Sequence, residues 1–574
     1  MSAELGLAVV SVVDICIKLA NKALSICQAF RTAKKDLSDK VLILESLWTK
    51  LEAQLAFLRK IKDHLTDDLA QCHFNLLQRL HGTLLQAVSQ LEVAASSLTT
   101  PANTGRGHGL SKILQLDRWK YALAKKGLDA LMIELQVWQG LFDPSWYTIM
   151  LIGGKVLDPA LEQSRQDSSP PLQQVQLSLS PLENMVALRK AIDFETSRET
   201  GGPDTIILDS SGWEFAKTIT IAFSAAKAVA PIESQSLYVI EPIDISSGVD
   251  TDSTSDAQQL CRRLQNVDPD TFGLLRCKGL VNVIHDTDCL PTGLKIVYHT
   301  PAHTDSLNLP TTLRCLLLEQ RPVCLSSVVK LAKQLVRSVS FVHTCDLVHK
   351  NIRPENVLLF PPVLASQRPL ELGEAFLVGF SQFRSINLET NRLGDTAWHR
   401  NLYRHPARQG LCILERYIMQ HDIYSLGVCL LEIGLWRPLV WYPFVNDSTL
   451  SSQHPSNQGG LGKPVPRPSL STPNPVPGSA LQLRKQLSDR DFEYAHLPGV
   501  TSWIKEDLVM LARQSLPQRM GRLYTEVVVD CLTCLDDGND RFGSWDEGKS
   551  KQDVVTVGVK FVERILGKIE EISV

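Results

Sequence analysis

The hydrophobic pattern of this chain changes its period twice, and that change restricts the folds open to it. Over residues 3–142, apolar residues recur at helical spacing without strand-like alternation. Short apolar runs bounded by Gly, Pro, Ser and Asp follow, a pattern typical of strands. From Leu325 onward the helical period returns. With 574 residues the chain is too long for one core, so the pattern predicts an all-helical domain followed by a mixed one.

The first 160 residues are expected to fold as an antiparallel helical bundle (residues 1–160). Four long amphipathic segments with short connections favour that architecture. Their apolar positions lie within residues 5–30, 41–58, 69–91 and 110–138. The first segment is apolar nearly all round between Leu5 and Ala20, which suits either the centre of a bundle or entry into lipid. The centre of a bundle is the preferred alternative.

The rest of the chain is expected to form a linker and two lobes. Residues 161–195 read as a linker that carries one short helix, about Pro181 to Asp193. Residues 196–310 hold the strand-like runs, and residues 311–574 are mainly helical. The predicted strands are Thr205–Leu208, Thr218–Phe223, Leu237–Ile240 and Leu294–Tyr298, with a helix near Ala257–Leu264. The Ser/Pro/Gly-rich residues 443–480 cannot build a core and are expected to be a disordered insertion.

Composition argues against several kinds of partner and cofactor. The formal net charge of −3 disfavours non-specific nucleic-acid binding. The 13 cysteines are scattered and follow no signal peptide, so we expect reduced thiols and a cytoplasmic protein. Cys531 and Cys534 are close in sequence, but without a second pair or a His cluster they predict two thiols on a helix rather than zinc ligands. No apolar stretch reaches the roughly 20 residues of a membrane span.

A series of motifs in the second half of the chain resembles the landmarks of protein kinases. Residues 348–356 read Val-His-Lys-Asn-Ile-Arg-Pro-Glu-Asn, similar to the catalytic loop H-R-D-L-x-x-x-N, and apolar residues 357–359 follow as a strand. Gly379-Phe380-Ser381 then stands where kinases carry D-F-G, and residues 403–407 resemble the A-P-E segment. Asp422 opens a segment similar to the buried helix whose Asp caps the catalytic loop. The resemblance implies a multidomain chain: an N-terminal all-α bundle plus a C-terminal two-lobed α+β protein-kinase-like fold.

The same motifs depart from the chemistry of the family. The catalytic Asp of kinases accepts the proton of the substrate hydroxyl, and an amide in its place, Asn351, is not basic. Gly379 replaces the metal-binding Asp, which leaves Asn356 as one remaining metal ligand of the family. The packing and capping positions are kept by His349, Phe380 and Asp422. We therefore expect a pseudokinase that is not an enzyme, with no catalytic residue, cofactor or metal.

The small lobe is expected to depart from the family as well. The turn Asp209–Phe215 is taken as the counterpart of the glycine-rich loop, and its acids on either side of one glycine would repel phosphate. The third strand, near Val239–Pro242, contains no lysine. The next helix offers Arg262 and Arg263 but no glutamate for the usual ion pair. Loss of the general base alone typically lowers the rate by about 10²- to 10⁴-fold.

The N-terminal region resembles a second family. Its opening residues Glu4–Val10, its long helices and the segment Leu141–Trp146 are similar to HeLo-type (prion-inhibition and propagation) domains of filamentous fungi. This resemblance implies a fungal non-self-recognition or cell-death effector. Its bundle would self-associate, or engage a membrane through about residues 1–20, under control of the pseudokinase. The layout is also similar to that of the mixed-lineage-kinase-like executioners of animal necroptosis, which implies a brace at Pro181–Asp193.

Two alternatives to this non-catalytic effector stay open. The first is an atypical active Ser/Thr protein kinase that binds ATP. The second is an interaction scaffold in which both domains only dock protein partners. All three hypotheses expect protein partners and no nucleic acid, and the effector hypothesis adds membrane association on activation.

Overall fold

The computed structural model describes residues 2–30, 35–99, 110–149, 154–167, 181–193, most of 206–443, 474–481, 488–493, 501–536, and 551–574. The chain forms two compact units. The helical unit comprises residues 1–193 and 545–563, and the α+β unit comprises residues 194–544 and 564–574. This division differs from the expected boundaries, which assigned the whole C-terminal segment to the second domain.

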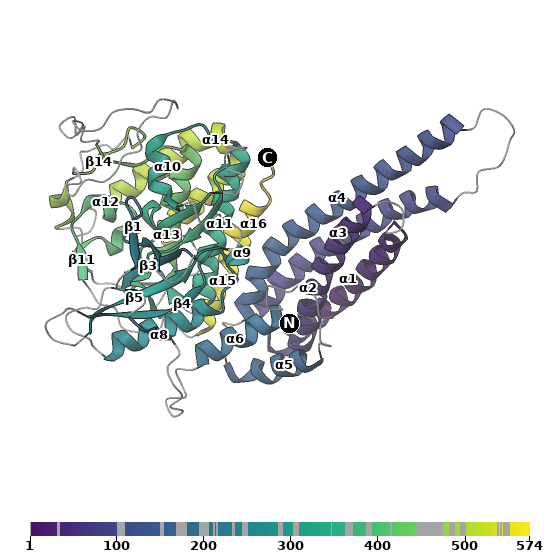
Figure 1. Ribbon diagram of the computed structural model, residues 1–574, viewed down its shortest axis with the longest axis horizontal. Coiled ribbons are helices and arrows are strands. Elements are labelled where there is room, and N and C mark those ends of the chain that lie inside the picture. The colour runs from purple at the N-terminus through teal and green to yellow at the C-terminus, as the bar shows by residue number, and fades with distance from the viewer. Residues whose placement is uncertain are drawn as a thin grey trace. The chain divides into compact units, whose positions relative to one another are not determined.

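The helical unit is built on four long helices, as the sequence pattern predicts (Figure 1). They are α1 (Ser2–Phe30), α2 (Lys35–Lys60), α3 (Asp67–Thr99) and α4 (Leu110–Thr148). Helix α3 packs against α1 and α4, while α2 packs against the same two helices. Val9, Val13 and Cys16 of α1 are fully buried in the core. One apolar face of α1 therefore lies in the bundle centre, the preferred of the two placements, while Leu7 and Ile15 are exposed.

Two shorter helices pack on α2. Helix α5 (Gly154–Asp167) contacts α2 and α6, and α6 (Pro181–Asp193) begins and ends where the sequence predicts the short helix. Arg189 of α6 joins Asp158 of α5 through an Nε–Oδ1 distance of 3.2 Å. The expectation of a linker from residue 161 is wrong for residues 161–167, which continue α5. The remaining linker residues, 168–180, lie outside the described residues.

The last helical segment contributes to both units. Helix α15 (Lys551–Phe561) packs on α3 and α4, and its Thr556 hydroxyl donates to Asp68 Oδ2 at 3.0 Å. A π-helical turn, Val562–Leu566, follows, and then α16 (Gly567–Glu570) packs on α11 and α14 of the α+β unit. The predicted last helix, about Thr556 to Ile572, therefore exists with a change of geometry at its middle.

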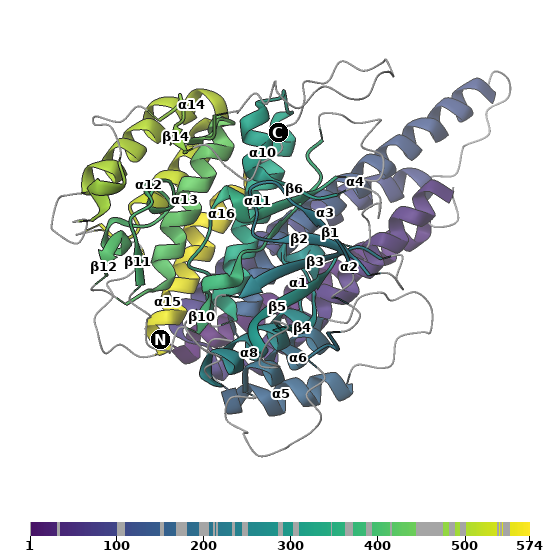
Figure 2. The ribbon, with the colours of Figure 1, turned by 60° about the vertical axis from the view of Figure 1, so that its left-hand side comes forward.

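The small lobe of the α+β unit is a five-stranded antiparallel sheet in the order β1-β2-β3-β5-β4 (Figure 2). Its strands are β1 (Lys217–Thr220), β2 (Lys227–Ala230), β3 (Tyr238–Ile243), β4 (Cys277–Ile284) and β5 (Pro291–His299). Helix α8 (Thr251–Gln265) packs on β4 and confirms the helix predicted there. Strands β2 and β4 were not predicted. Thr205–Leu208 is not a strand of this sheet, because its described residues make only one bridge, from Ile207 to Leu280.

The large lobe is mainly helical around a buried central helix. This helix, α13 (Met419–Leu435), is buried along its whole length and packs against α11 (Leu325–Thr344) and α14 (Ser502–Leu532). Three short strands, β6 (Thr311–Thr312), β8 (Val357–Phe360) and β9 (Glu374–Leu377), form a sheet that carries the motif loops. The expected disordered insertion, 443–480, lies largely outside the described residues, but its end forms β14 (Val476–Pro477), paired with β13 (Val440–Trp441).

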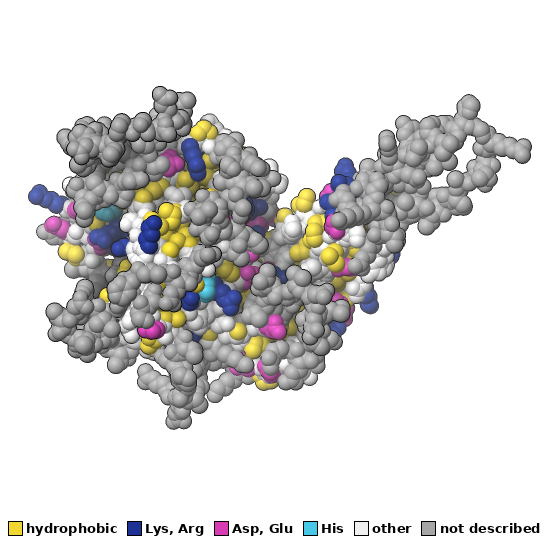
Figure 3. All heavy atoms as spheres, in the orientation of Figure 1, with side chains coloured by type: hydrophobic (Ala, Val, Ile, Leu, Met, Phe, Trp, Pro, Cys, Tyr) yellow, Lys and Arg dark blue, Asp and Glu magenta, His cyan; other side chains and the backbone are white. Residues whose placement is uncertain are grey.

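The surface of the described residues mixes both signs of charge. In the space-filling view, basic and acidic side chains are interspersed on the visible face (Figure 3). Among the described helices, none has both the length and the apolar character needed to cross a membrane.

Candidate functional site

Asp422, at the start of α13, anchors the loop of residues 348–356. Its carboxylate accepts hydrogen bonds from the backbone N–H of His349 at 2.8 Å and of Lys350 at 2.9 Å. The Tyr417 hydroxyl donates to the same carboxylate at 2.7 Å, and His343 Nε2 lies 3.2 Å from it. These hydrogen bonds keep the pKa of the buried carboxyl below its ordinary value despite burial. Asp422 thus accepts hydrogen bonds from the backbone of this loop, at the position where the kinase resemblance implies a capping Asp.

His349 and Phe380 form the packed floor of the site. His349 Nε2 donates to Val378 O at 3.1 Å, and Nδ1 accepts from the Asn351 N–H at 3.3 Å. These contacts require the neutral imidazole, and burial lowers its pKa to about 4. The Phe380 ring is buried, with its centroid 4.6 Å from that of His349. Both residues act through packing, as the sequence predicts.

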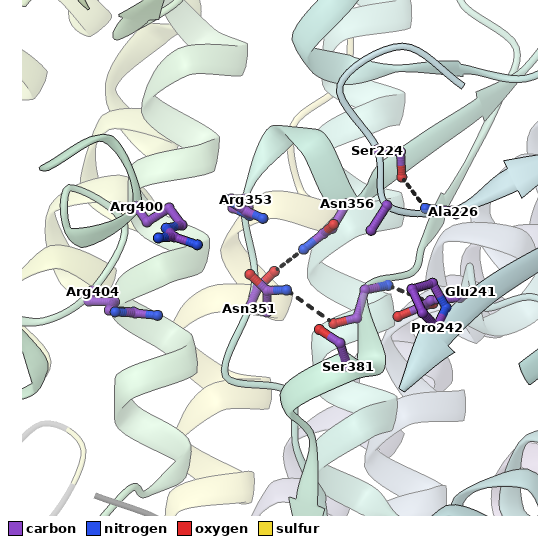
Figure 4. A pocket seen from close by; sticks show the side chains of 12 residues that line it. Ser224, Ala226, Glu241, Pro242, Asn351, Arg353, Asn356, Ser381, Arg400 and Arg404 are labelled. Carbon is purple, nitrogen blue, oxygen red and sulfur yellow. Dashed lines mark hydrogen bonds between the residues drawn. The ribbon is translucent and has the colours of Figure 1, made fainter. Parts of the chain in front are cut away.

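Asn351, Asn356 and Gly379 meet at the centre of the site (Figure 4). Asn356 Nδ2 donates to Asn351 O at 2.7 Å, and the side chain of Asn351 donates to Gly379 O at 3.4 Å. Gly379 has a φ of +96°, and a Cβ at this position would lie 2.3 Å from Asn356 Cγ. A glycine is thus required here by the backbone angle and by the neighbouring amide.

Glu241 of β3 supplies a carboxylate that the sequence reasoning did not count as part of the site. β3 contains no lysine, as expected, and Glu241 points instead toward the segment after β9. Glu241 Oε2 accepts the N–H of Gly379 at 3.0 Å and the hydroxyl of Tyr298 at 3.3 Å. Its Oε1 is buried and has no hydrogen-bond partner among the described residues. Burial raises the pKa of this carboxyl to about 7, although its hydrogen bonds act in the opposite direction.

The acidic turn predicted to face phosphate is wrongly placed. The turn between β1 and β2 covers residues 221–226, not 209–215, because β1 begins at Lys217. It contains no acid: Ser224, Ala225 and Ala226 of this turn line the site, and Ser224 Oγ accepts the Ala226 N–H at 3.2 Å. This turn therefore carries no charge that would repel phosphate, and the acidic side chain that lines the cavity is Glu241 of β3.

A cavity of about 170 Å³ joins these residues. Arg353, Arg400 and Arg404 line one side of it, while Glu241 and Pro242 lie on the other side of Asn351 (Figure 4). Arg353 belongs to the loop motif and Arg404 lies in the A-P-E-like segment, but Arg400 of α12 (Trp398–Asn401) belongs to neither motif. Only the folded chain brings them to the loop. Sequence reasoning missed all three arginines.

Two side chains of the site could hold a magnesium ion. Mg²⁺ commonly uses one or two carboxylates together with substrate phosphates. Here Glu241 Oε1 has no protein partner, and Asn356 uses its Nδ2 rather than its oxygen toward Asn351. These residues fit a metal held mainly by a nucleotide. In the described part of the chain, no group of three or more His, Cys, Asp or Glu side chains could hold a metal by itself.

The paired cysteines have a structural environment. Cys531 lies in α14 and Cys534 just beyond it, and both are buried. The thiol of Cys534 donates to Gln420 O at 3.2 Å. Burial raises the pKa of both thiols well above the ordinary value, which makes them poor nucleophiles.

Known proteins similar to this chain are kinases. No protein-family model matches it. The serine/threonine-protein kinase ATG1 of Mycosarcoma maydis is 30% identical over 190 residues, which cover 32% of this chain and 17% of that protein. Eukaryotic translation initiation factor 2-alpha kinase 1 of Mus musculus is 28% identical over 121 residues, covering 20% and 18%. A crystal structure of the yeast RNA Pol II CTD kinase CTDK-1 complex covers 43% of this chain and 67% of its own, at 14% identity and a TM-score of 0.26.

These relatives correct one prediction and confirm another. The chain spans less than a fifth of the length of each curated relative given above. Because both are named as kinases, the prediction that this protein is not an enzyme is contradicted. The predicted fold class is confirmed by the sheet order, the central helix and these relatives together. The chain consists of an N-terminal helical region and a C-terminal region with the two-lobed, protein-kinase-like α+β fold.

Proposed function

We propose that the α+β unit is an atypical protein kinase that transfers a phosphoryl group from ATP to Ser or Thr hydroxyls. One observation carries the proposal: Glu241 places a buried carboxylate, with one oxygen unpartnered, against the backbone of Gly379. The missing Asp side chain at Gly379 is thereby replaced by a carboxylate that comes from β3. The names of the similar kinases support this reaction class and a hydroxyl acceptor.

Phosphoryl transfer requires little covalent chemistry from the protein, because its transition state is largely dissociative. The terminal phosphoryl group passes to the acceptor oxygen, ADP leaves, and the hydroxyl proton is released to water, since Asn351 cannot accept it. Magnesium, when bound, neutralises charge on the phosphates. Glu241 and Asn356 would hold it, Arg353 would face the phosphates, and Asp422 keeps the loop in place. Without a general base the rate is about 10²- to 10⁴-fold below that of a typical kinase.

The test measures nucleotide binding and transfer on the full chain. ATP with Mg²⁺ is expected to raise the melting temperature more than ATP with EDTA, and to label casein slowly on Ser or Thr. Glu241→Gln removes the charge with little change in shape, so the Mg²⁺-dependent part of the shift and the labelling should both disappear. Glu374→Gln, a half-exposed Glu on β9, is the matched control. Equal shifts with Mg²⁺ and EDTA, or unchanged labelling by Glu241→Gln, would contradict the proposal.

For the helical unit we propose a role as the effector region of the same protein, in which it self-associates or binds a membrane, as the HeLo resemblance implies. The large apolar residues Leu7 and Ile15 of α1 are 58% and 40% exposed, and they support a contact with another surface. The full chain should leak dye from anionic liposomes, or oligomerise, in a way that Leu7→Ser/Ile15→Ser abolishes. The control is the double variant Leu42→Ser/Ile43→Ser, which changes two exposed apolar residues of α2. If neither leakage nor oligomers depend on α1, only a scaffold role remains for this unit.

A further inference from the structure

The arginine side of the cavity brings three guanidinium groups together, and Asp395 is the carboxylate that forms ion pairs with two of them. Arg400 pairs with Asp395 at an Nε–Oδ2 distance of 2.6 Å, and Arg404 lies 3.6 Å from the same oxygen. Asp395 is therefore shared by two guanidinium groups. The third, Arg353, makes no ion pair with the described residues, and its Nε is buried without a hydrogen-bond partner. The set of three arginines and one carboxylate is named here the arginine wall.

The three cations of the arginine wall repel one another. Burial lowers the pKa of Arg404, Asp395 opposes that effect, and the charges of Arg400 and Arg353 lower the pKa further. Glu355, a buried carboxylate of the same loop, pairs with Arg314 at 2.8 Å, and its charge is shared between Arg314 and Arg353. A bound anion would supply the missing negative charge. Arginine forks match phosphate oxygens geometrically, and hydrogen bonds between two charged groups are roughly twice as strong as neutral ones.

The size of the cavity favours a small anionic group over a whole nucleotide. Pockets that enclose a drug-sized ligand usually measure about 300 to 1,000 Å³. The cavity here measures about 170 Å³, and its lining residues come from the β1–β2 turn, β3, the 348–356 loop and the α12 region. That volume accommodates a phosphate group on a short side chain, whereas a whole nucleoside triphosphate would extend outside it.

We propose that the arginine wall binds a phosphate monoester on a protein side chain, a phosphoserine or phosphothreonine of a partner or substrate. The ligand would therefore be a protein that another kinase has already phosphorylated. The inference rests on the proposed function only in that both use the same cavity. Phosphate binding is measurable whether or not transfer takes place.

The experiment uses the full chain and calorimetric titration in EDTA with inorganic phosphate, O-phospho-L-serine, ATP, and an alanine-flanked peptide with and without phosphate on its serine. Inorganic phosphate, phosphoserine and the phosphopeptide should bind, and the unphosphorylated peptide should not. Arg353→Gln and Arg404→Gln should each weaken binding about tenfold or more. Arg522→Gln, an exposed arginine paired with Glu526 in α14, is the control and should change nothing.

Several outcomes would overturn the inference. They are equal binding of the two peptides, phosphopeptide binding that survives both arginine substitutions, and arginine-dependent binding of ATP without any binding of the phosphopeptide. Arg353→Gln serves as the second variant if Arg404→Gln does not fold, since Arg353 has fewer protein contacts. Glu241→Gln separates the two proposals: it should abolish the Mg²⁺ effect and keep or strengthen phosphopeptide binding, because it removes a negative charge from the opposite side of the cavity.

Discussion

Single residues determine what the site can and cannot do. Gly379 illustrates this, because the position lacks the metal-binding carboxylate of kinases and a side chain there would be strained. Both its φ of +96° and the 2.3 Å approach of Asn356 Cγ disfavour a Cβ. An Asp at this position would displace Asn356 rather than restore the family's metal site. The carboxylate of Glu241, on β3, instead accepts the backbone N–H of Gly379 at 3.0 Å.

Gly379→Ala should therefore destabilise the α+β unit by about 2 kcal/mol or more, because the positive φ and the contact with Asn356 both add cost. Gly521→Ala is the matched control: its φ is +80°, but no atom lies within 4 Å of the added Cβ. Chemical denaturation measures the free energy of unfolding of both variants, and the difference between them gives the cost of the contact with Asn356. Equal destabilisation would mean that Asn356 moves away freely.

At the scale of elements, buried ion pairs join segments that are far apart in sequence. Arg314 of α10 (Leu313–Glu319) is fully buried and contacts Glu355 Oε1 at 2.8 Å and Glu432 Oε1 of α13 at 2.9 Å. It also donates to the Tyr403 hydroxyl and to Val440 O. One side chain thus connects α10, the loop, the 403–407 segment and α13. Ala407 replaces the Glu of the A-P-E segment in this chain, and the segment is held by Tyr403 through this cluster.

Arg314→Leu should lower the free energy of unfolding of the α+β unit by about 3 to 5 kcal/mol, because it leaves two buried carboxylates without their cation. Arg321→Leu, at a 45% exposed arginine 3.9 Å from Glu319, should cost less than about 1 kcal/mol. Guanidinium titrations of the full chain, with hydrogen exchange in α13 as the local probe, make the comparison. If Arg314→Leu lowered the free energy of unfolding no more than Arg321→Leu does, the two carboxylates would not depend on Arg314 for their stability in the core.

Over the whole molecule, the two units are expected to differ in how their stability responds to acid. In the α+β unit, burial lowers the pKa of His349 to about 4 and of His405 to about 3, and lowers that of His421 as well. Among the described residues of the helical unit, His73 is the comparable group, and burial lowers its pKa to about 3. These groups stabilise the fold above the ordinary pKa of 6.5, and that stability is lost as pH falls toward the folded values.

The unfolding temperature of the α+β unit should therefore fall more than that of the helical unit between pH 7 and pH 5. Glu241 acts in the opposite sense: its pKa is raised to about 7, so it lowers stability as pH rises from 4.5 to 7. Calorimetry of the full chain at pH 7 and pH 5 tests the prediction, and hydrogen exchange assigns each unfolding transition to one unit. His73→Gln should remove most of the shift from the helical unit. An equal fall in unfolding temperature for both units would contradict the prediction.

Elements with a strong hydrophobic period were predictable, and those defined by pairing were not. The four bundle helices and Pro181–Asp193 were predicted because an amphipathic helix carries its signal within its own residues. Strands β2 and β4 were missed, and the β1–β2 turn was misplaced by about a dozen residues, because a strand of four to eight residues is recognised mainly by its neighbour.

Residue types at short spacing were enough to predict the helical region and the kinase-like order of motifs that includes His349, Phe380 and Asp422. The folded chain alone reveals the carboxylate of Glu241 beside Gly379, the three arginines that face one cavity, and the C-terminal segment that both units share. Those features depend on segments more than 40 residues apart in the chain. No local pattern records such contacts, because the chain must first bury its core before these side chains meet.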